Sequence, residues 1–307
     1  MEENLALAAR LRAAGCVFAE DEAELLSSTA RSPAELDALV ERRVAGEPLE
    51  QVVGWAEFAG LRILVSPGVF VPRRRSEFLV KLAVALIRRH NVHQSPGASV
   101  STATVIADLC CGTGALGLAI AIDIGAGLGG SMPGTVELHS ADLDPAAVAC
   151  AGRNVAPAGG RVYGGDLFDA LPSALRGRVD VLICNAPYVP TDEVAFLPAE
   201  ARDHEPLVAL DGGLDGLSVL RRAASGAPGW LAPGGVLLVE TSDRQAQEMA
   251  SVMASAGLVA RVHADEESGA TVVTGSAEPP RQARIRAHSY VPDCAPGTSA
   301  TDHLEHR

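Results

Sequence analysis

The sequence predicts an α/β fold in which helices cover both faces of a mainly parallel sheet, preceded by a small helical segment. From Thr104 onward, short apolar runs alternate with Ala- and Leu-rich segments of helical length. Such alternation is typical of parallel strands joined by helices. One apolar run also passes directly into a glycine-containing loop and then a helix, as at the ligand-binding edge of many α/β sheets.

The first 49 residues are predicted to form a separate helical domain. Leu and Ala recur at helical intervals from Glu3 to Ala14 and from Asp21 to Thr29. Ser32-Pro33 resembles an N-cap followed by proline at the first helical position. A third helix is therefore expected from Ala34 to Val44, and residues 1–49 form the first domain of this prediction.

A β-hairpin is predicted to connect this helical domain to the sheet. Between Glu50 and Val71, β-branched and aromatic residues are interrupted by Gly60 and by Pro67-Gly68, which is typical of short strands and turns. Residues 50–71 are therefore expected to form a hairpin linker, residues 72–277 the larger domain, and residues 278–307, rich in Pro, Ser, Thr and charge, a flexible tail. The larger domain is expected to contain, in order, helix Phe78–His90, strand Thr104–Leu109, helix Leu116–Ile124, strand Thr135–Ala141, helix Ala146–Asn154, strand Val179–Cys184, helix Gly216–Ala227, strand Gly235–Glu240, helix Arg244–Ala256, and strands Leu258–His263 and Ala270–Thr274.

Composition limits the classes of function. A chain of 307 residues that is 48% hydrophobic can bury the core of an enzyme. Its net charge of -13 disfavours gripping nucleic acid through phosphates, so no stable nucleic-acid binding is expected. We find no apolar run long enough to span a bilayer and no basic start of a signal peptide. The chain is therefore expected in the cytoplasm, away from membranes, and no pair of CxxC motifs indicates a metal site.

A small ligand is predicted at the first glycine loop, in "VIADLCCGTGALGLAIA". An apolar strand ends near Asp108 and runs into Gly112-Thr113-Gly114 before a helix. Glycines let the backbone approach a ligand, and the helix N-terminus offers free N–H groups. Asp142, at the end of the next strand, is placed to bond both ribose hydroxyls of a nucleoside. Taken singly, the glycines could merely turn the chain and Asp142 could merely cap a helix starting near Pro145. Together they predict a cofactor site formed by Asp108, Gly112, Thr113, Gly114 and Asp142.

The turn Asn185-Ala186-Pro187-Tyr188, after the strand Val179–Cys184, suggests which ligand this is. The Asn185 side-chain oxygen and the Ala186 carbonyl can each accept a hydrogen from a planar NH₂ group. Pro187 stiffens the turn, and Tyr188 can pack against a flat substrate. Because an amide nitrogen is a poor nucleophile, a site helps most by aligning it with a sulfonium methyl group. The turn therefore predicts S-adenosyl-L-methionine as donor, with Asn185, Ala186, Pro187 and Tyr188 as catalytic residues.

The sequence resembles the HemK/PrmC family of protein-(glutamine-N5) methyltransferases. The stretches "RRVAGEPLEQVVGWAEFAGLRILVSPGVFVPRRRSEFLV", "HEPLVALDGGLDGLSVLRRA" and "WLAPGGVLLVE" carry the resemblance, together with the glycine loop and the turn 185–188. The resemblance covers nearly the whole chain apart from the tail. It implies a Rossmann-like class I S-adenosylmethionine-dependent methyltransferase domain with an N-terminal helical domain and a connecting hairpin.

The resemblance also implies roles for individual residues. Gly112, Gly114 and Asp142 match donor-binding positions of the family, as does Asn185 in the turn. The remaining matched residues are Asp166 and Leu167 near the adenine, and Pro72, Arg73 and Glu77 at the substrate entrance. The chain departs from the family pattern at Ala186, where proline is usual, and at Arg74-Arg75-Ser76, where the family has Pro, an acid and Thr.

The expected activity is methyl transfer from S-adenosylmethionine to the side-chain amide of a glutamine in a protein. The family's members imply a peptide-chain release factor or a ribosomal protein as substrate, held by the helical substrate-recognition domain. Two alternatives stay open. The same turn suits the exocyclic N6 amine of adenine in nucleic acid, and Ala186 leaves room for a catalytically weak donor-binding protein. The sequence does not predict the oligomeric state.

Overall fold

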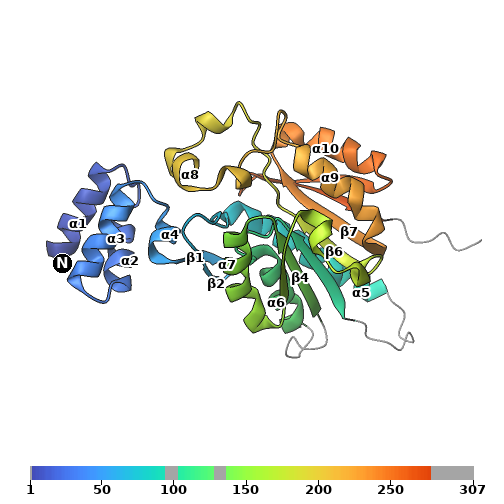
Figure 1. The fold of residues 1–307 in the computed structure, drawn as a ribbon, viewed down its shortest axis with the longest axis horizontal. Helices are drawn as coiled ribbons and strands as arrows, with labels where there is room; N and C mark the ends of the chain where they lie inside the picture. The colour runs from blue at the N-terminus through green and yellow to red at the C-terminus, as the bar shows by residue number, and fades with distance from the viewer. Residues whose placement is uncertain (1, 94–102, 128–135, 278–307) are drawn as a thin grey trace, which may run out of the picture.

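A seven-stranded sheet lies at the centre of the larger domain (Figure 1) in the computed structural model, which describes residues 2–93, 103–127 and 136–277. The strand order is β5-β4-β3-β6-β7-β9-β8. Strands β3 to β7 are parallel, whereas β9 runs antiparallel to both β7 and β8. The strands are β3 Thr104–Leu109, β4 Val136–Asp142, β5 Arg161–Gly164, β6 Val179–Cys184, β7 Leu231–Thr241, β8 Val259–Asp265 and β9 Ala270–Ser276. The predicted α/β fold with a mostly parallel sheet is confirmed.

Helices pack on both faces of this sheet. One core lies between the sheet and α5 and α6, where Leu79, Ala83 and Ile120 are fully buried. The other core lies under α9 and α10, where Leu220 and Met249 are fully buried. The helices of this domain are α5 Glu77–His93, α6 Ala115–Gly127, α7 Pro145–Val155, α8 Ala199–His204, α9 Ser218–Gly226 and α10 Asp243–Ser255. Both faces of the strands are therefore covered, which explains their nearly continuous apolar sequences.

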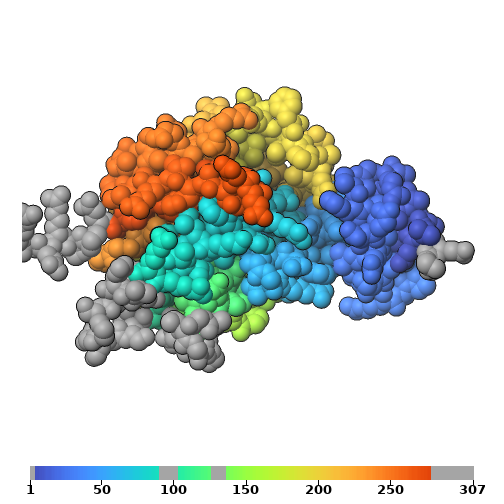
Figure 2. Space-filling model, turned by 180° about the vertical axis from the view of Figure 1, so that it is seen from behind, coloured from blue at the N-terminus to red at the C-terminus, as the bar shows by residue number. Residues whose placement is uncertain are grey.

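The N-terminal residues form a three-helix bundle at one end of the molecule (Figures 1 and 2). Its helices are α1 Glu2–Ala13, α2 Ala19–Thr29 and α3 Pro33–Val44, and they share a small core that includes Leu11, Leu26 and Val40. The Ser32 side chain accepts a hydrogen bond from the Glu35 backbone N–H at 3.2 Å. The predicted cap of the third helix is confirmed.

The β-hairpin of the connector is shorter than predicted. The expected hairpin covered residues 50–71, but α4 Leu49–Val53 occupies the start of that range and Gly54, with φ of 84°, ends it. Only β1 Trp55–Phe58 and β2 Leu61–Leu64 pair, in antiparallel register. The five residues of α4, LEQVV, are too few to show a helical period, so periodicity could not separate a short helix from a strand here.

Two elements of the larger domain were not predicted at all. Strand β5 lies at the edge of the sheet and is partly exposed, so it lacks a continuous apolar run. Helix α8 has six residues and follows Pro198 directly, which makes it too short to show a helical period. The predicted tail 278–307 lies outside the described residues. Within the described ranges, no helix is both long and apolar enough to cross a bilayer.

Candidate active site

A cavity of about 520 Å³ opens at the carboxyl ends of the parallel strands, the edge where α/β sheets bind ligands. Most of the predicted site residues meet in it. Those that line it are Pro72, Arg73, Gly112, Thr113, Asp142, Asp166, Leu167, Asn185, Ala186, Pro187 and Tyr188. Asp108, Gly114 and Glu77 were also predicted at the site but are not among the lining residues.

The loop between β3 and α6 brings backbone N–H groups to the cavity wall. Gly112 takes a φ of 55°, a conformation that suits glycine. Its N–H donates to Asp142 Oδ2 at 2.8 Å. Gly114 stands behind the wall, where an added Cβ would lie 2.6 Å from Val155 Cγ2. Gly114 therefore allows close packing between the loop and α7, while Gly112 and Thr113 face the cavity.

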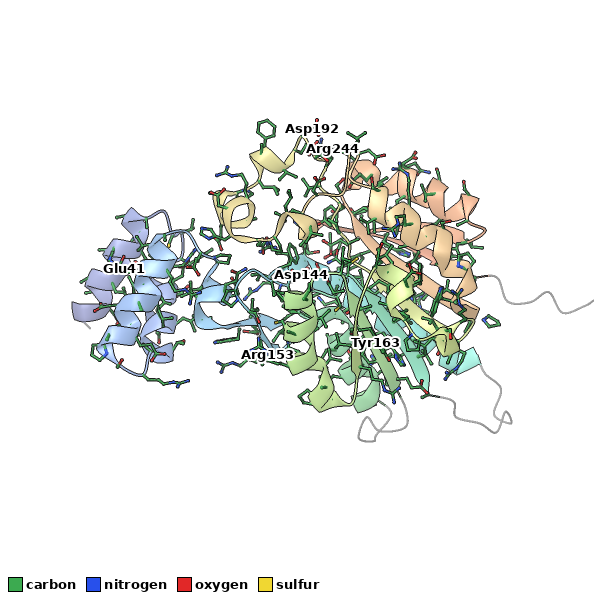
Figure 3. The ribbon with its side chains drawn as sticks, viewed as in Figure 1. Glu41, Asp144, Arg153, Tyr163, Asp192 and Arg244 are labelled. Carbon is green, nitrogen blue, oxygen red and sulfur yellow. The ribbon has the colours of Figure 1, made fainter. Side chains whose placement is uncertain are left out.

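The side chain of Asp142, at the end of β4, connects this strand to the loop that follows β3. Besides Gly112, it receives a hydrogen bond from the Asp144 backbone N–H, at 2.9 Å on Oδ1. Burial raises the pKa of its carboxyl, and these backbone donors oppose the shift. The cap of α7 is Asp144, which accepts from the Ala146 N–H at 2.8 Å and lies at the start of that helix (Figure 3). Asp142 is therefore not the helix cap and faces the ligand space.

Asp108 lies one layer deeper. Its side chain is fully buried, and Oδ2 accepts from the Gly117 backbone N–H at 3.0 Å. Burial raises the pKa of this carboxyl to about 7, and the nearby charge of Asp142 adds to the shift. Asp108 therefore holds α6 against the strand from behind the loop.

The position predicted to lie near the adenine is paired with a residue that the sequence did not single out. Asp166 lines the cavity and forms an ion pair with Arg222 of α9 at 2.7 Å. Leu167, with φ of 47°, lines the cavity beside it. Arg222 also lines the cavity, and because 56 residues separate the pair, no local pattern could have predicted the contact.

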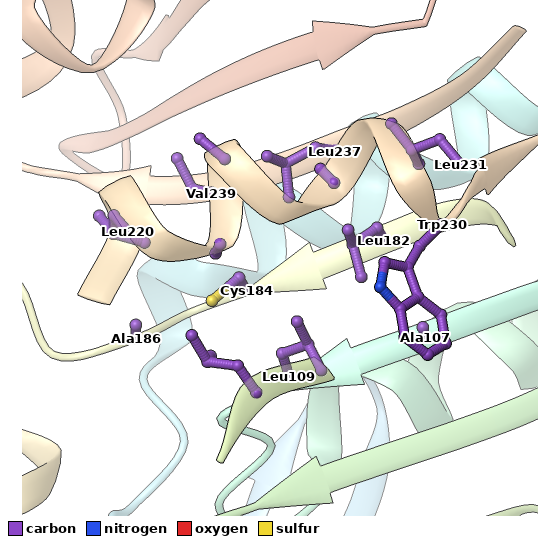
Figure 4. Close-up of a cluster of buried hydrophobic side chains, with 14 of the residues drawn as sticks. Ala107, Leu109, Leu182, Cys184, Ala186, Leu220, Trp230, Leu231, Leu237 and Val239 are labelled. Carbon is purple, nitrogen blue, oxygen red and sulfur yellow. The ribbon is translucent and has the colours of Figure 1, made fainter. Parts of the chain in front are cut away.

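The turn 185–188 presents unused acceptors to the cavity. Among the described residues, no group makes a hydrogen bond to the Asn185 side chain or donates to the Ala186 carbonyl. Ala186 is 2% exposed as a residue, and it lies just beyond the end of β6, near Cys184 and Leu220 (Figure 4). Alanine thus fills a packed position in the turn while leaving its carbonyl available.

A glycine-rich segment, residues 211–216, supports the turn from the other side. An added Cβ at Gly216 would lie 2.2 Å from the Tyr188 carbonyl oxygen, and one at Gly212 would lie 2.7 Å from that of Pro187. Gln245 Nε2 also donates to the Tyr188 carbonyl at 2.9 Å. The letters "DGGLDG" were the available signal for this support, because close backbone approach is what requires glycine.

At the predicted substrate entrance, Arg73 belongs to an ion pair and is not a free charge. Arg73 pairs with Glu205, whose side chain is fully buried and which accepts from the Val71 N–H at 3.1 Å on Oε1. Burial raises the pKa of Glu205, and Arg73 opposes that shift. Glu77 plays a different part, because its Oε1 accepts from the Ala59 N–H at 3.0 Å and so holds the turn of the β1–β2 hairpin.

The residues in the cavity fit S-adenosylmethionine. The Asp142 carboxylate can accept hydrogen bonds from ribose hydroxyls, and the apolar Leu167 side chain can lie against a base. A volume of about 520 Å³ lies within the usual range for small-molecule sites, and the turn 185–188 forms part of the same wall. Within the described ranges, no cluster of three or more His, Cys, Asp or Glu side chains is arranged to hold a metal ion.

Comparison with known proteins gives close relatives and a fold match. Release factor glutamine methyltransferase of Streptomyces coelicolor is 37% identical over 207 residues, which is 67% of each chain. That of Bradyrhizobium diazoefficiens is 34% identical over 82% of this chain and 86% of its own. A 4-amino-L-phenylalanine/4-methylamino-L-phenylalanine methyltransferase of Streptomyces pristinaespiralis is 34% identical over 71% of this chain and 69% of its own.

A solved structure of the hMettl16 catalytic domain in complex with a 3'UTR hairpin has a TM-score of 0.50 at 11% identity. It covers 78% of this chain and 81% of that one, and the likeness concerns the fold.

No family model matches the chain. Relatives that are 34–37% identical over most of the chain confirm the resemblance to the HemK/PrmC family. The strand order and the cavity agree with that family assignment. The chain belongs to the family of release factor glutamine methyltransferases, enzymes that use S-adenosylmethionine as methyl donor.

Proposed function

We propose that this protein methylates the side-chain amide nitrogen of a glutamine in a peptide-chain release factor. The observation that carries the proposal is the pair of unused acceptors in the turn, the Asn185 side chain and the Ala186 carbonyl, in the same cavity as Gly112 and Asp142. Two acceptors at the end of one strand match the two N–H bonds of a planar amide. The relatives named for this reaction support the same substrate.

The chain's own residues have separable roles in this reaction. Asp142 and the loop at Gly112 hold the donor, with Asp166 and Leu167 at its adenine end. Asn185 and the Ala186 carbonyl orient the amide, and the ring of Tyr188 forms a wall against its flat face. When bound, S-adenosylmethionine supplies the methyl group. Alignment is the main contribution, because the amide nitrogen is weakly nucleophilic and positioning can lower the barrier by several kcal/mol, roughly 7 in favourable cases.

The helical domain is proposed to hold the protein substrate. Pro48, at its junction with the larger domain, lines the cavity. Arg43 of α3 reaches Glu200 of α8, with 3.4 Å between Nη1 and Oε2, so the bundle and α8 both border the opening. A release factor acts together with the ribosome, so we propose the cytoplasm as the site of action.

The test is transfer of a labelled methyl group to purified substrates. The full-length protein is incubated with methyl-labelled S-adenosylmethionine and, separately, with an unmethylated release factor, with free 4-amino-L-phenylalanine and with adenine-containing RNA. We expect label on the release factor alone. Label on the free amino acid would instead align the chain with the Streptomyces pristinaespiralis relative, and label on RNA would support the adenine alternative.

A further inference from the structure

The hydroxyl group of Tyr188 is held from two sides. It donates a hydrogen bond to Glu240 Oε1 at 3.0 Å and receives one from Arg75 Nη2 at 2.6 Å. Arg75 Nε also donates to the same Glu240 oxygen at 3.0 Å. The three side chains close a triangle, and the guanidinium lies over the tyrosine ring, 5.9 Å from its centroid.

The carboxylate in this triangle is deeply buried. Glu240 is 2% exposed, and its second oxygen, Oε2, has no hydrogen-bond partner among the described residues. All its described polar contacts therefore go to Arg75 and Tyr188 through Oε1. Burying a carboxylate is costly unless a cation and a donor compensate it. Burial and the charge of Glu240 raise the pKa of the Tyr188 hydroxyl, which keeps it protonated and able to donate.

The three residues come from distant parts of the chain and meet only at the cavity. Arg75 lies just before α5, Tyr188 lies in the turn 185–188, and Glu240 lies near the end of β7. In the sequence, 165 residues separate Arg75 from Glu240. All three line the same cavity as Asn185. Arg74, the neighbouring arginine, is exposed and does not line the cavity, and its side chain has no polar partner among the described residues.

We propose that Arg75 and Glu240 are positioning residues for methyl transfer, which act through the Tyr188 hydroxyl to fix the ring beside Asn185. This proposal rests on the proposed function, because it concerns the Tyr188 ring that would form one wall of the amide site. Tyr188 is tied at its carbonyl by Gln245 and at its hydroxyl by the triangle. With both ends tied, the ring has one orientation when the substrate arrives, so the substrate does not have to order it.

Steady-state kinetics of four variants test the positioning role. Arg75→Ala should lower kcat about tenfold and leave the Kd for the donor product within about twofold. Tyr188→Phe, which removes only the hydroxyl, should lower kcat by a similar factor. Because both changes break the same contact, the double variant should be no slower than Tyr188→Phe. Arg74→Ala, the matched control, should have the kcat of the unaltered protein.

Either of two kinetic results overturns the proposal. One is an unchanged kcat for Arg75→Ala. The other is that Arg75→Ala lowers kcat by the same factor in the unaltered protein and in Tyr188→Phe. Arg75 would then act without the Tyr188 hydroxyl.

A spectroscopic measurement tests the contact without any substrate. The chain contains three tyrosines, so labelling their ζ carbons with ¹³C gives few signals, and Tyr188→Phe identifies the one from Tyr188. Arg75→Ala and Glu240→Gln should shift this signal, whereas Arg74→Ala should leave it in place. An unmoved signal in Arg75→Ala contradicts the proposal. If the signal moves but no release factor is methylated, the proposed function has failed and the contact has not.

Discussion

At the scale of single residues, two aspartates at neighbouring strand ends have different roles. Asp142 faces the cavity and accepts two backbone N–H groups, from Gly112 and Asp144. Asp108 lies behind the loop and accepts one, from Gly117. The sequence placed both near the ligand because both follow apolar strands. It could not distinguish them, since one strand's end points into the cavity and the other's into the packed layer beneath it.

Replacing Asp142 should weaken donor binding. Asp142→Ala removes the proposed ribose acceptor and leaves the N–H groups of Gly112 and Asp144 unpaired, so we expect the Kd for S-adenosylhomocysteine to rise at least about tenfold. Asp144→Ala is the control: it removes the cap of α7 and should cost about 1 kcal/mol of stability, with donor affinity nearly unchanged. Calorimetric titration measures both, and equal affinities for the two variants would contradict the assignment.

The raised pKa of Asp108 predicts a pH-dependent stability. The pKa rises from 3.8 to about 7 in the folded protein, so the folded state holds the proton more tightly than the unfolded chain does. Stability from this group is therefore lost as the pH rises from about 4 to 7, by about 4 kcal/mol. Asp108→Asn mimics the neutral form and can still accept from Gly117.

Denaturation of both proteins across this range checks the prediction. At pH 4 the variant and the unaltered protein should have similar free energies of unfolding. At pH 8 the variant should be the more stable one. A difference that does not change with pH would contradict the raised pKa.

At the scale of elements, the strands with continuous apolar runs could be predicted from the sequence. The edge strand, the short helix and the contacts between turns could not. The bounds of β3 and β6 agree with the prediction to the residue, because buried strands of a parallel sheet are apolar throughout and end at turn residues. The edge strand β5 and the short helix α8 gave no such signal. Gly212 and Gly216 are visible in the sequence, but the carbonyl groups of Pro187 and Tyr188 that they approach lie more than 20 residues away.

Gly216 should be intolerant of a side chain. Gly216→Ala places a Cβ at a φ of 76° and 2.2 Å from the Tyr188 carbonyl oxygen, so the turn must move. We expect a loss of stability above the roughly 1 kcal/mol of backbone strain alone, together with a fall in kcat. Gly257→Ala is the control, because Gly257 has a φ of 84° with nothing within 4 Å and should show the strain without the loss of activity. Similar kcat values for the two variants would contradict the supporting role of Gly216.

At the scale of the whole molecule, one arginine links the helical bundle to the larger domain. Arg43 donates to Glu22 within the bundle at 2.7 Å and lies 3.4 Å from Glu200 of α8. The side chains of Arg43 and Glu22 are 10% and 9% exposed, so this pair is largely removed from water. The sequence predicted the bundle and the larger domain separately, but no local pattern could show that α8 joins them.

Removing Arg43 should loosen this junction. Arg43→Met leaves the Glu22 carboxylate buried without its cation, so we expect a loss of about 3 kcal/mol. The KM for the protein substrate should rise while donor affinity stays the same. Arg10→Met removes an arginine from an exposed pair with Glu41 and should change stability by less than about 1 kcal/mol. If Arg43→Met weakens donor binding as much as it raises this KM, the bundle is not a separate contact surface for the protein substrate.

In the proposed reaction, the turn 185–188 holds a glutamine amide beside the methyl donor. Tandem mass spectrometry of a release factor after reaction with the unaltered protein and with Asn185→Ala tests this role most directly. With the unaltered protein we expect one added methyl group on a glutamine side-chain nitrogen. With Asn185→Ala we expect a rate at least about 100-fold lower and donor affinity nearly unchanged. A methyl group on another type of atom, or full activity without the Asn185 side chain, would contradict this role.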